Sequence, residues 1–389
     1  MNKLFQVACA AVAVLLLAGC SSTKSSRKTQ QEPDAHVVRA LQAIQAKYAP
    51  DRRLAIFSIS AAREGDYLIL KGEVENPDAK KELVETLSHM GIKVADRITV
   101  LPSATLGDRT WGIITLSVVN VREERGQPAE LGTQVMMGHV VRLWKTEQGW
   151  YYVQSSDRYL GWTEDDGVVP CTKEPVNAWN ASKRLIVTAF ADRIWEKPST
   201  KSVPVSDVVT GALVRNTGVE GDWFKVELPD GRTGYLARDS ATDYEEWSKS
   251  RQPSPANIEQ TAKSLMGLPY LWGGTSVKGV DCSGFTKVVY FLNGVHLNRN
   301  ASHQARQGTE VVVDPEFKNL KKGDLLFFGS KAASGKPERV VHVGIYLGDK
   351  LFIHSSGRVK INSLDSRSPI ADERRIRTLL YARRVLPGA

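Results

Sequence analysis

The stretch that decides the fold reads LPYLWGG at 268–274 and DCSGFT at 281–286. After Cys282, the spacing i, i+3, i+4 and i+7 of one buried helix face is occupied by Phe285, Val288, Val289 and Leu292. Asp281 stands directly before this helix and is a favourable N-cap. Cys282 therefore lies in the first helical turn, where unpaired backbone N–H groups and the helix dipole favour a thiolate. We predict a nucleophilic cysteine with a lowered pKa.

A hairpin that carries two histidines follows at 341–354, with the sequence VHVGIYLGDKLFIH. A three-residue loop at 348–350 would place like side chains opposite each other, with Leu347 facing Leu351, Ile345 facing Ile353 and Tyr346 facing Phe352. His342 and His354 then project from one face as diagonal neighbours, roughly 7–8 Å apart between Cα atoms. We predict that His342 is the base for Cys282 and that His354 orients its ring.

Together these residues resemble the NlpC-type family of papain-like bacterial cell-wall peptidases, over about residues 252–386. The resemblance implies that Cys282 attacks a carbonyl, that His342 takes its proton and that His354 fills the third catalytic position. It implies that Tyr270 helps to bind the oxyanion. It also implies that the glutamate portion of the substrate is held by Trp272, Asp281 and Ser283. No metal or cofactor is expected.

One position departs from the family pattern. The family often has Arg-Asp-Ser or Arg-Asp-Ala after the nucleophilic helix, whereas this chain has Arg-Asn-Ala-Ser at 299–302. Ala301 and Ser302 are therefore the candidate substrate residues here, and a contact that a serine supplies elsewhere comes from Ser302 or is missing.

Two other interpretations of this region remain open. A buried cysteine and two strand histidines are also common as ordinary core residues. A zinc site of Cys282, His342 and His354 has no evident fourth ligand, although His296 and His303 lie in the same region. The combination of helix start, Gly-Gly approach and paired histidines favours catalysis.

The first 20 residues resemble a bacterial lipoprotein signal. Lys3 precedes an apolar run at 7–17, which is too short to span a bilayer permanently, and LAGC at 17–20 forms a lipobox. Cleavage would leave Cys20 as the lipidated N-terminus and anchor the protein to a membrane. In a Gram-negative host, Ser21 after the cysteine implies the outer membrane, facing the periplasm. Residues 21–35 are polar and predict a flexible tether.

Charge and cysteine content narrow the function classes. The chain has 52 Lys and Arg against 43 Asp and Glu, for a net charge of +9, which suits an anionic wall or membrane surface. The basic residues are dispersed, so nucleic acid is not an expected partner, and we expect a monomer.

After processing at Cys20, the remaining thiols are Cys282 and Cys171, and Cys171 is expected to be an ordinary packed or loop cysteine.

Residues 36–105 predict a small α/β module. A helix is expected over 37–47, strands over 54–59 and 67–74, a second helix from 76 to about 90, and a strand over 92–101. The outline is similar to a bacterial BON-like module. A spacer or docking role is the default.

An internal repeat fills the middle of the chain. Residues recur at a constant offset of 73, with Gly138, Val141, Arg142, Trp150, Val153 and Gly161 matched by Gly211, Val214, Arg215, Trp223, Val226 and Gly234. Short aromatic strands broken by turns predict two small β-barrels, over 106–175 and 176–246. The pattern resembles tandem bacterial SH3-like barrels.

The two copies differ at positions that the resemblance makes important. Glu130 and Tyr159 of the first copy become Val203 and Arg232 in the second. In the multidomain branch that the chain resembles, the first barrel lends an acid and a tyrosine to bind a free amine of L-alanine. An ammonium buried without a carboxylate partner would cost on the order of 3–5 kcal/mol.

The predicted architecture is therefore multidomain, and it ends in an α+β papain-like peptidase domain over 247–389. The resemblance implies a cysteine endopeptidase that cuts the bond between γ-D-glutamate and the diamino acid of murein stem peptides with a free N-terminal L-alanine. One alternative is the same chemistry on intact peptidoglycan stems. Another is a non-catalytic, lipid-anchored protein that binds the wall through its barrels.

Overall fold

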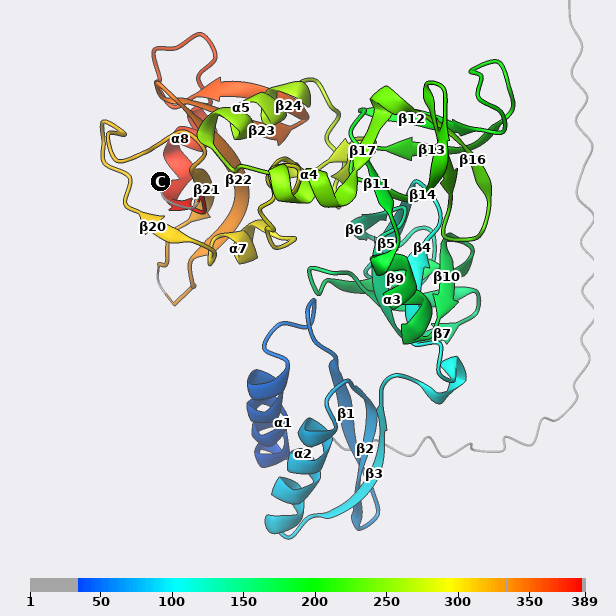
Figure 1. The fold of residues 1–389 in the computed structure, drawn as a ribbon. Coiled ribbons are helices and arrows are strands. Elements are labelled where there is room, and N and C mark those ends of the chain that lie inside the picture. The colour runs from blue at the N-terminus through cyan, green and yellow to red at the C-terminus, as the bar shows by residue number, and fades with distance from the viewer. Residues whose placement is uncertain (1–33, 334, 387–389) are drawn as a thin grey trace, which may run out of the picture.

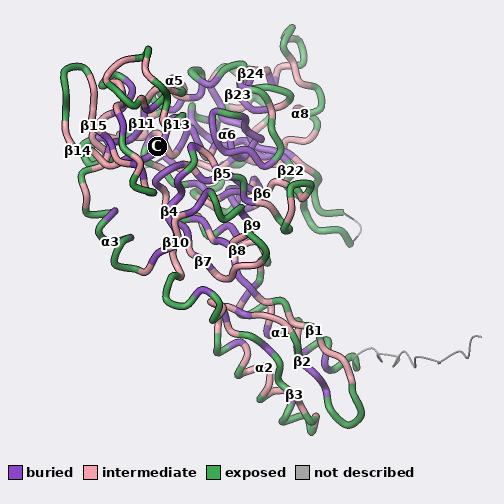
Figure 2. The backbone as a smooth tube through the Cα atoms, turned by 90° about the vertical axis from the view of Figure 1, so that its right-hand side faces the viewer, coloured by how far each residue is buried: buried purple, intermediate pink, exposed green. Residues whose placement is uncertain are grey.

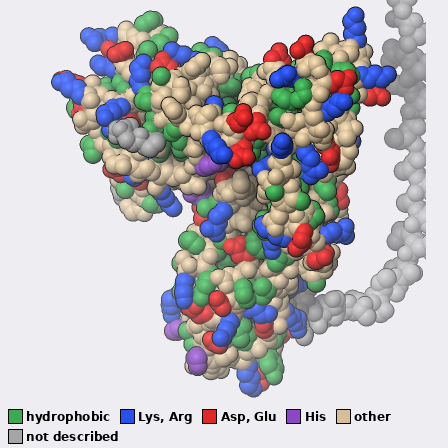
Figure 3. Space-filling model, viewed as in Figure 1, with side chains coloured by type: hydrophobic (Ala, Val, Ile, Leu, Met, Phe, Trp, Pro, Cys, Tyr) green, Lys and Arg blue, Asp and Glu red, His purple; other side chains and the backbone are tan. Residues whose placement is uncertain are grey.

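The computed structural model describes residues 34–333 and 335–386. Cys20 and the lipobox lie outside the described residues. An α/β unit, two β-rich units and a C-terminal α+β unit follow one another along the chain (Figure 1). None of the helices in the described part is both long and apolar enough to span a membrane. Positive and negative side chains are interspersed over the face drawn in Figure 3.

The N-terminal module packs two helices against a three-stranded sheet. Its elements are α1 (Ala35–Tyr48), β1 (Phe57–Glu64), β2 (Tyr67–Val74), α2 (Pro77–His89) and β3 (Lys93–Val100). β1 and β2 are antiparallel, whereas β2 and β3 are parallel because α2 forms the crossover between them. Asn76 caps α2 by accepting a hydrogen bond from Asp78 N. The first strand was expected at 54, but it begins at Phe57 because Leu54 N and Ala55 N form a turn onto Asp51 O.

Each β-rich unit is a seven-stranded antiparallel sheet. The first contains β4 (Trp111–Ile114), β5 (Val118–Arg122), β6 (Leu131–Met136), β7 (Val140–Glu147), β8 (Trp150–Gln154), β9 (Leu160–Glu164) and β10 (Val168–Cys171). The second contains β11 (Arg184–Val187), β12 (Ala191–Trp195), β13 (Pro204–Val209), β14 (Leu213–Glu220), β15 (Trp223–Glu227), β16 (Thr233–Ala237) and β17 (Ala241–Asp243). η1 (Ala104–Leu106) precedes the first unit, and α3 (Lys173–Ala181) links the two units. Inside the units, η2 (Asp165–Gly167) lies between β9 and β10, and η3 (Arg238–Ser240) lies between β16 and β17.

The strands reproduce the repeat that the sequence contains. β4 begins at Trp111 and β11 at Arg184, and the other strands of the two copies start at the same offset of 73. The position that Tyr159 occupies in the first copy has a different contact in the second. Arg232, the counterpart of Tyr159, donates to Thr115 O at 3.1 Å and so joins the two barrels. Cys171 is buried and forms no disulfide.

The C-terminal domain places helices on both faces of a six-stranded antiparallel sheet, in the order β20-β25-β21-β22-β23-β24. The strands of this sheet are β20 (Thr309–Val311), β21 (Leu325–Ser330), β22 (Arg339–Gly348), β23 (Leu351–Ser356), β24 (Arg358–Ser363) and β25 (Leu379–Arg384). A separate two-stranded sheet contains β18 (Thr275–Ser276) and β19 (Gly279–Val280). The helices of the domain are α4 (Tyr244–Ser250), α5 (Pro255–Ser264), α6 (Cys282–Phe291), α7 (Ala301–Gln304) and α8 (Glu373–Thr378). α6 buries Phe285 and Val289 against the sheet, and it is among the most buried elements in Figure 2.

The histidine hairpin has the predicted side-chain matching but a different turn. Ile345 pairs with Ile353 and Tyr346 with Phe352, as expected. The prediction of a three-residue loop is wrong, because Leu351 pairs with Gly348 and Leu347 forms a bulge. Asp349 and Lys350 alone make the turn, with φ of 50° and 61°, the left-handed values that a tight hairpin turn requires. The bulge adds the residue that the shorter turn removes, so both histidines stay on one face.

The first barrel and the C-terminal domain share a buried polar contact. Gln134 N donates to Thr275 Oγ1 at 3.1 Å, and Thr275 N and Ser276 Oγ donate to Gln134 Oε1 at 3.0 and 2.9 Å. Lys287 of α6 pairs with Asp157 of the barrel at 2.8 Å. These contacts hold the barrel against the domain whose helix α6 carries Cys282.

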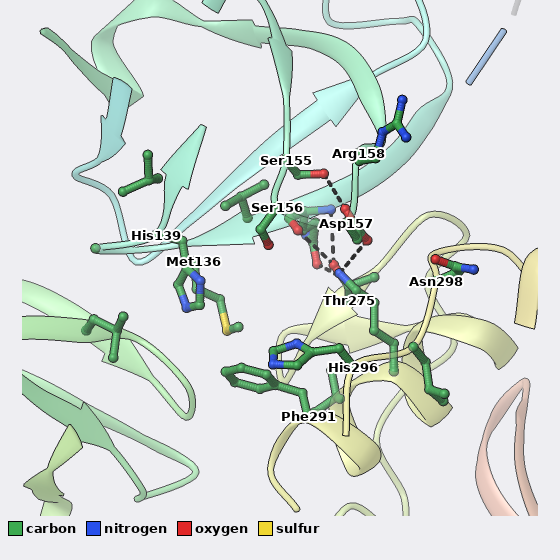
Figure 4. A pocket seen from close by; sticks show the side chains of 18 of the residues that line it. Met136, His139, Ser155, Ser156, Asp157, Arg158, Thr275, Phe291, His296 and Asn298 are labelled. Atoms are coloured by element: carbon green, nitrogen blue, oxygen red, sulfur yellow. Dashed lines mark hydrogen bonds and ion pairs between the residues drawn. The ribbon is translucent and has the colours of Figure 1, made fainter. Parts of the chain in front are cut away.

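A cavity of about 650 Å³ lies beside this contact. In Figure 4, Met136 and His139 of the first barrel face Phe291 and His296 of the C-terminal domain across it. The His139 and Phe291 rings pack edge to face with centroids 5.9 Å apart. His139 also bonds through Nε2 to the Gly211 carbonyl of the second barrel. The two barrels and the C-terminal domain therefore meet at this cavity.

Gly273 allows a close approach of the two backbones across the same interface. Its φ is +80°, and a Cβ there would lie 2.1 Å from Leu131 O of the barrel. We predict that Gly273→Ala lowers the free energy of unfolding by about 1–3 kcal/mol more than Gly267→Ala. Gly267 is the matched control, since its φ is +82° and nothing lies within 4 Å. Denaturant midpoints measure the difference, and equal midpoints would refute a close interdomain contact.

Candidate functional site

The start of α6 is fixed by one carboxylate. Asp281 Oδ1 accepts from Gly284 N at 2.7 Å as the predicted N-cap, and Oδ2 accepts from Gly273 N at 3.0 Å. A Cβ on Gly284 would lie 2.0 Å from Gly274 O, so only glycine lets the loop pass this close to the helix. Cys282 is thereby held as the first residue of α6.

Arg299 completes this arrangement from the segment before α7. Its side chain is only 1% exposed, and its Nη atoms donate to both oxygens of Asp281, at 2.5 and 3.1 Å. Nη1 also donates to Ser283 Oγ at 3.0 Å. Arg299 was not predicted as a site residue, although the Arg-Asn-Ala-Ser stretch that contains it was noticed as a departure. Asp281 and Ser283 are thus engaged in building the site, and their contact with substrate stays a prediction.

The two histidines are hydrogen-bonded to each other. His342 Nε2 lies 2.7 Å from His354 Nδ1, and the rings are perpendicular. His354 Nε2 lies 3.0 Å from Asn362 Oδ1. Asn362 Nδ2 donates to the Ile370 carbonyl at 2.9 Å, which fixes the orientation of the amide.

These bonds set the tautomer of each ring in turn. Because Asn362 presents an oxygen, His354 Nε2 carries a proton and its Nδ1 is an acceptor. His342 must then donate through Nε2, which leaves His342 Nδ1 without a proton and able to act as a base. Asn362 was missed by the sequence analysis. It is diagonal to His354 across β23 and β24, and only the register of that pair reveals it.

The electrostatics correct the expectation of a low-pKa cysteine. Burial raises the pKa of the Cys282 thiol to about 11, and the charge of Asp281 adds to the rise. Hydrogen bonding from Val343 N, next to His342, and the charge of Arg299 only partly oppose it. Burial also lowers the pKa of His342 well below its usual range and that of His354 to about 4. At neutral pH the resting site therefore holds a thiol and neutral imidazoles.

Tyr270 lies close enough to Cys282 that a thiolate on Cys282 would raise the pKa of the Tyr270 phenol. Burial, followed by the Cys282 and Asp281 charges, raises the pKa of the Tyr270 phenol far above its usual value. The phenol therefore stays protonated and remains a hydrogen-bond donor, as a group that binds an oxyanion must.

Cys282 opens onto a pocket of about 400 Å³. All seven predicted substrate residues line it, namely Glu130, Tyr159, Trp272, Asp281, Ser283, Ala301 and Ser302. Arg53 and Glu123 also line it, and neither was predicted. The pocket therefore combines residues from the N-terminal module, the first barrel and the C-terminal domain.

The two barrel residues reach the pocket in different ways. Glu130 Oε1 accepts a hydrogen bond from the Trp272 indole at 2.6 Å, which links the barrel to the C-terminal domain. Tyr159 is 3% exposed, and a Cβ on Gly132 would lie 2.8 Å from its ring. Gly132 therefore makes room for Tyr159 at the pocket wall. Within the described residues, no group of three or more His, Cys, Asp or Glu side chains is placed to hold a metal ion.

Known protein families match two parts of this chain. The NlpC/P60 family matches residues 267–377, and the bacterial dipeptidyl-peptidase Sh3 domain matches residues 122–168. The chain is 31% identical over 271 residues to dipeptidyl-peptidase 6 of Lysinibacillus sphaericus, covering 66% of this chain and 93% of that protein. The chain belongs to the NlpC/P60 family.

Two further matches to this NlpC/P60 protein come from Bacillus cereus. A γ-D-glutamyl-L-lysine dipeptidyl-peptidase is 31% identical over 271 residues, covering 66% of this chain and 76% of the relative. A crystal structure of an NlpC/P60 family protein has a TM-score of 0.59 at 25% identity, covering 71% of this chain and 100% of that one. The predicted papain-like domain, the SH3-like domain and the cysteine peptidase class are confirmed. The individual residue roles stay predictions.

We predict that Asn362→Leu lowers kcat by about 100-fold with little change in KM, because His354 loses the acceptor that sets both tautomers. The acid limb of the pH–kcat profile should also move to lower pH, since the Asn362 hydrogen bond raises the pKa of His354. In the wild type this limb should already lie below pH 6.5, because burial lowers the pKa of both histidines.

Asn362→Gln is the matched control, because it keeps an amide that can accept from His354 and donate to Ile370. It should restore activity to within about tenfold of the wild type. Equal losses in the Leu and Gln variants would mean that Asn362 acts through packing. An acid limb above pH 6.5 in the wild type would contradict the lowered pKa of the histidine base.

Proposed function

We propose that this NlpC/P60 peptidase hydrolyses the bond between γ-D-glutamate and the diamino acid of peptidoglycan stem peptides that have a free N-terminal L-alanine. One observation carries the proposal. Cys282 and the barrel residues Glu130 and Tyr159 line the same pocket, so a nucleophile and an acid face one substrate. The name of the Bacillus cereus relative, a γ-D-glutamyl-L-lysine dipeptidyl-peptidase, supports this substrate class.

The chemistry follows from the neutral resting site. As Cys282 Sγ attacks the γ-carbonyl carbon, His342 takes the thiol proton, and Tyr270 donates a hydrogen bond to the oxyanion. The C–N bond then breaks, and His342 returns the proton to the amine of the departing diamino acid. Water hydrolyses the remaining thioester and releases L-Ala-γ-D-Glu. The raised pKa of the thiol and the lowered pKa of the imidazole favour transfer of this proton during the attack.

Recognition of the free amine depends on the acidic end of the pocket. The Glu130 carboxylate is fixed by the Trp272 indole, and Glu123 adds a second acid to the same lining. An ammonium placed here gains a carboxylate partner. A stem still linked to glycan carries an amide instead, which leaves that carboxylate unpaired and adds bulk.

We also propose that the enzyme is lipid-anchored in the bacterial cell envelope through Cys20, at the outer membrane facing the periplasm. The lipobox LAGC at 17–20 supports this location. Cys20→Ser should shift the protein from the membrane fraction to the soluble fraction of the envelope. Unchanged fractionation of this variant would contradict a lipid anchor at that residue.

The proposal predicts that Glu130→Gln loses most of the preference for free amines. On the free tripeptide, kcat/KM should fall by about 10–100-fold, whereas on the N-acetylated tripeptide it should change little, because that substrate has no ammonium to pair. Glutamine keeps an acceptor for Trp272. Glu124→Gln is the matched control, since Glu124 belongs to the same loop but does not line the pocket, and it should match the wild type. Release of the diamino acid is measured, with Cys282→Ala as the inactive baseline.

The competing functions give different results in this assay. Equal wild-type activity on free and acetylated tripeptides, with strong activity on purified sacculi, would indicate an enzyme for intact wall. No release by the wild type from any of these substrates would indicate a wall-binding protein without activity.

A further inference from the structure

The N-terminal module reaches the active-site pocket through the segment between α1 and β1. Arg53 of this segment lines the pocket that contains Cys282. Its carbonyl accepts a hydrogen bond from Leu160 N at 2.9 Å, and the Gln154 amide donates to Leu54 O at 2.8 Å. Leu160 directly follows Tyr159, so Arg53 lies at the side of the pocket where the amine of the substrate is proposed to bind.

Arg53 is held in one position by its neighbours. Its Nε and Nη2 donate to the two oxygens of Asp51, at 2.9 and 2.6 Å. His303 of α7 touches the same pair, with Nε2 lying 2.6 Å from Asp51 Oδ2 and 3.0 Å from Arg53 Nη2. The His303 side chain is only 5% exposed. The cluster therefore joins the N-terminal module to the C-terminal domain.

The rest of the module is docked on the first barrel. Ile56 and Leu101 of the module bury an apolar contact with Leu160, beside Trp144 and Tyr152 of the barrel. Glu73 of β2 pairs with Lys145 of β7 at 2.8 Å, and the lysine side chain is 15% exposed. Such a combination of apolar burial and a half-buried ion pair keeps the 51–53 segment in place.

The charge of Arg53 is compensated where it lies. The guanidinium, donating through its side chain, holds the pKa of Asp51 well below its usual range, so the two groups remain an ion pair. An uncompensated guanidinium beside the proposed ammonium site would repel the substrate. The pair instead presents bulk with little net charge.

We infer that the N-terminal module forms an end wall of the active-site pocket and that Arg53 is a specificity-determining residue. The wall limits the amine side of the substrate to a single residue, so that an acyl or glycan-linked group on L-alanine meets the Arg53 side chain. This inference rests on the proposed function. It adds to the charge selection by Glu130 a second selection by volume, which comes from a different part of the chain.

The test uses the full-length protein and two substrates, the free tripeptide L-Ala-γ-D-Glu-diamino acid and its N-acetyl form. Arg53→Ala removes the wall, and the ratio of kcat/KM on the acetylated to the free tripeptide should rise by about tenfold or more. Arg53→Met keeps the length of the side chain without its charge, and its ratio should stay near the wild-type value. Arg52→Ala is the matched control, because Arg52 is exposed and does not line the pocket.

Each outcome separates the wall from the proposed function. Wild-type failure on the free tripeptide would remove the proposed function and the wall with it. Cleavage by the wild type with an unchanged ratio in Arg53→Ala would remove only the wall. Equal rises in the Ala and Met variants would mean that Arg53 acts through charge, which also overturns the inference. Circular dichroism and thermal melting of each variant establish that the fold is retained.

Discussion

The buried ion pair between Asp281 and Arg299 is the contact on which the active site depends. Asp281 accepts from Gly273 N, Gly284 N and Arg299, so one carboxylate joins the approach loop, the nucleophilic helix and the segment before α7. Loss of either partner would leave an unpaired buried charge, at a cost of about 3–5 kcal/mol. The same carboxylate raises the pKa of Cys282, and Arg299 partly offsets that effect. Asp281 thus fixes the position of Cys282 and also makes its thiol less acidic.

The first barrel and the N-terminal module then act as parts of the catalytic pocket. Gly273 lets the approach loop touch the backbone of the barrel, Gln134 bonds to β18, and Trp272 bonds to Glu130. Arg53 of the N-terminal module lines the same pocket. These contacts place residues of three structural units around one pocket. In the proposed function, specificity therefore depends on residues of all three units, whereas the predicted catalytic residues Cys282, His342 and His354 lie in the C-terminal domain.

Much of the fold could be predicted from local sequence. The helical spacing after Cys282, the matched side chains of the hairpin and the constant offset of 73 each depend on residues that lie close together in the chain or repeat regularly. The hairpin turn was wrong because a bulge at Leu347 with a two-residue turn preserves the same parity as a three-residue loop. The pattern of side chains cannot distinguish the two.

The site was only partly predictable for a different reason. The substrate residues predicted by resemblance all line one pocket, yet Arg299, Asn362 and Arg53 were missed because their roles depend on contacts across the fold. The prediction that the pKa of Cys282 is lowered was wrong, because burial and the nearby Asp281 carboxylate raise it. Helix position is visible in a sequence, whereas depth of burial is not.

We propose that Cys282 attacks the γ-glutamyl carbonyl of a peptide held by three structural units. Acid quenching of the enzyme within its first turnover on the free tripeptide, followed by mass spectrometry of the digested protein, would trap the intermediate of this attack. We expect a thioester-linked L-Ala-γ-D-Glu adduct on the fragment that contains Cys282. An adduct on Cys171, or turnover without any adduct on Cys282 at times when the acyl-enzyme should accumulate, would contradict it.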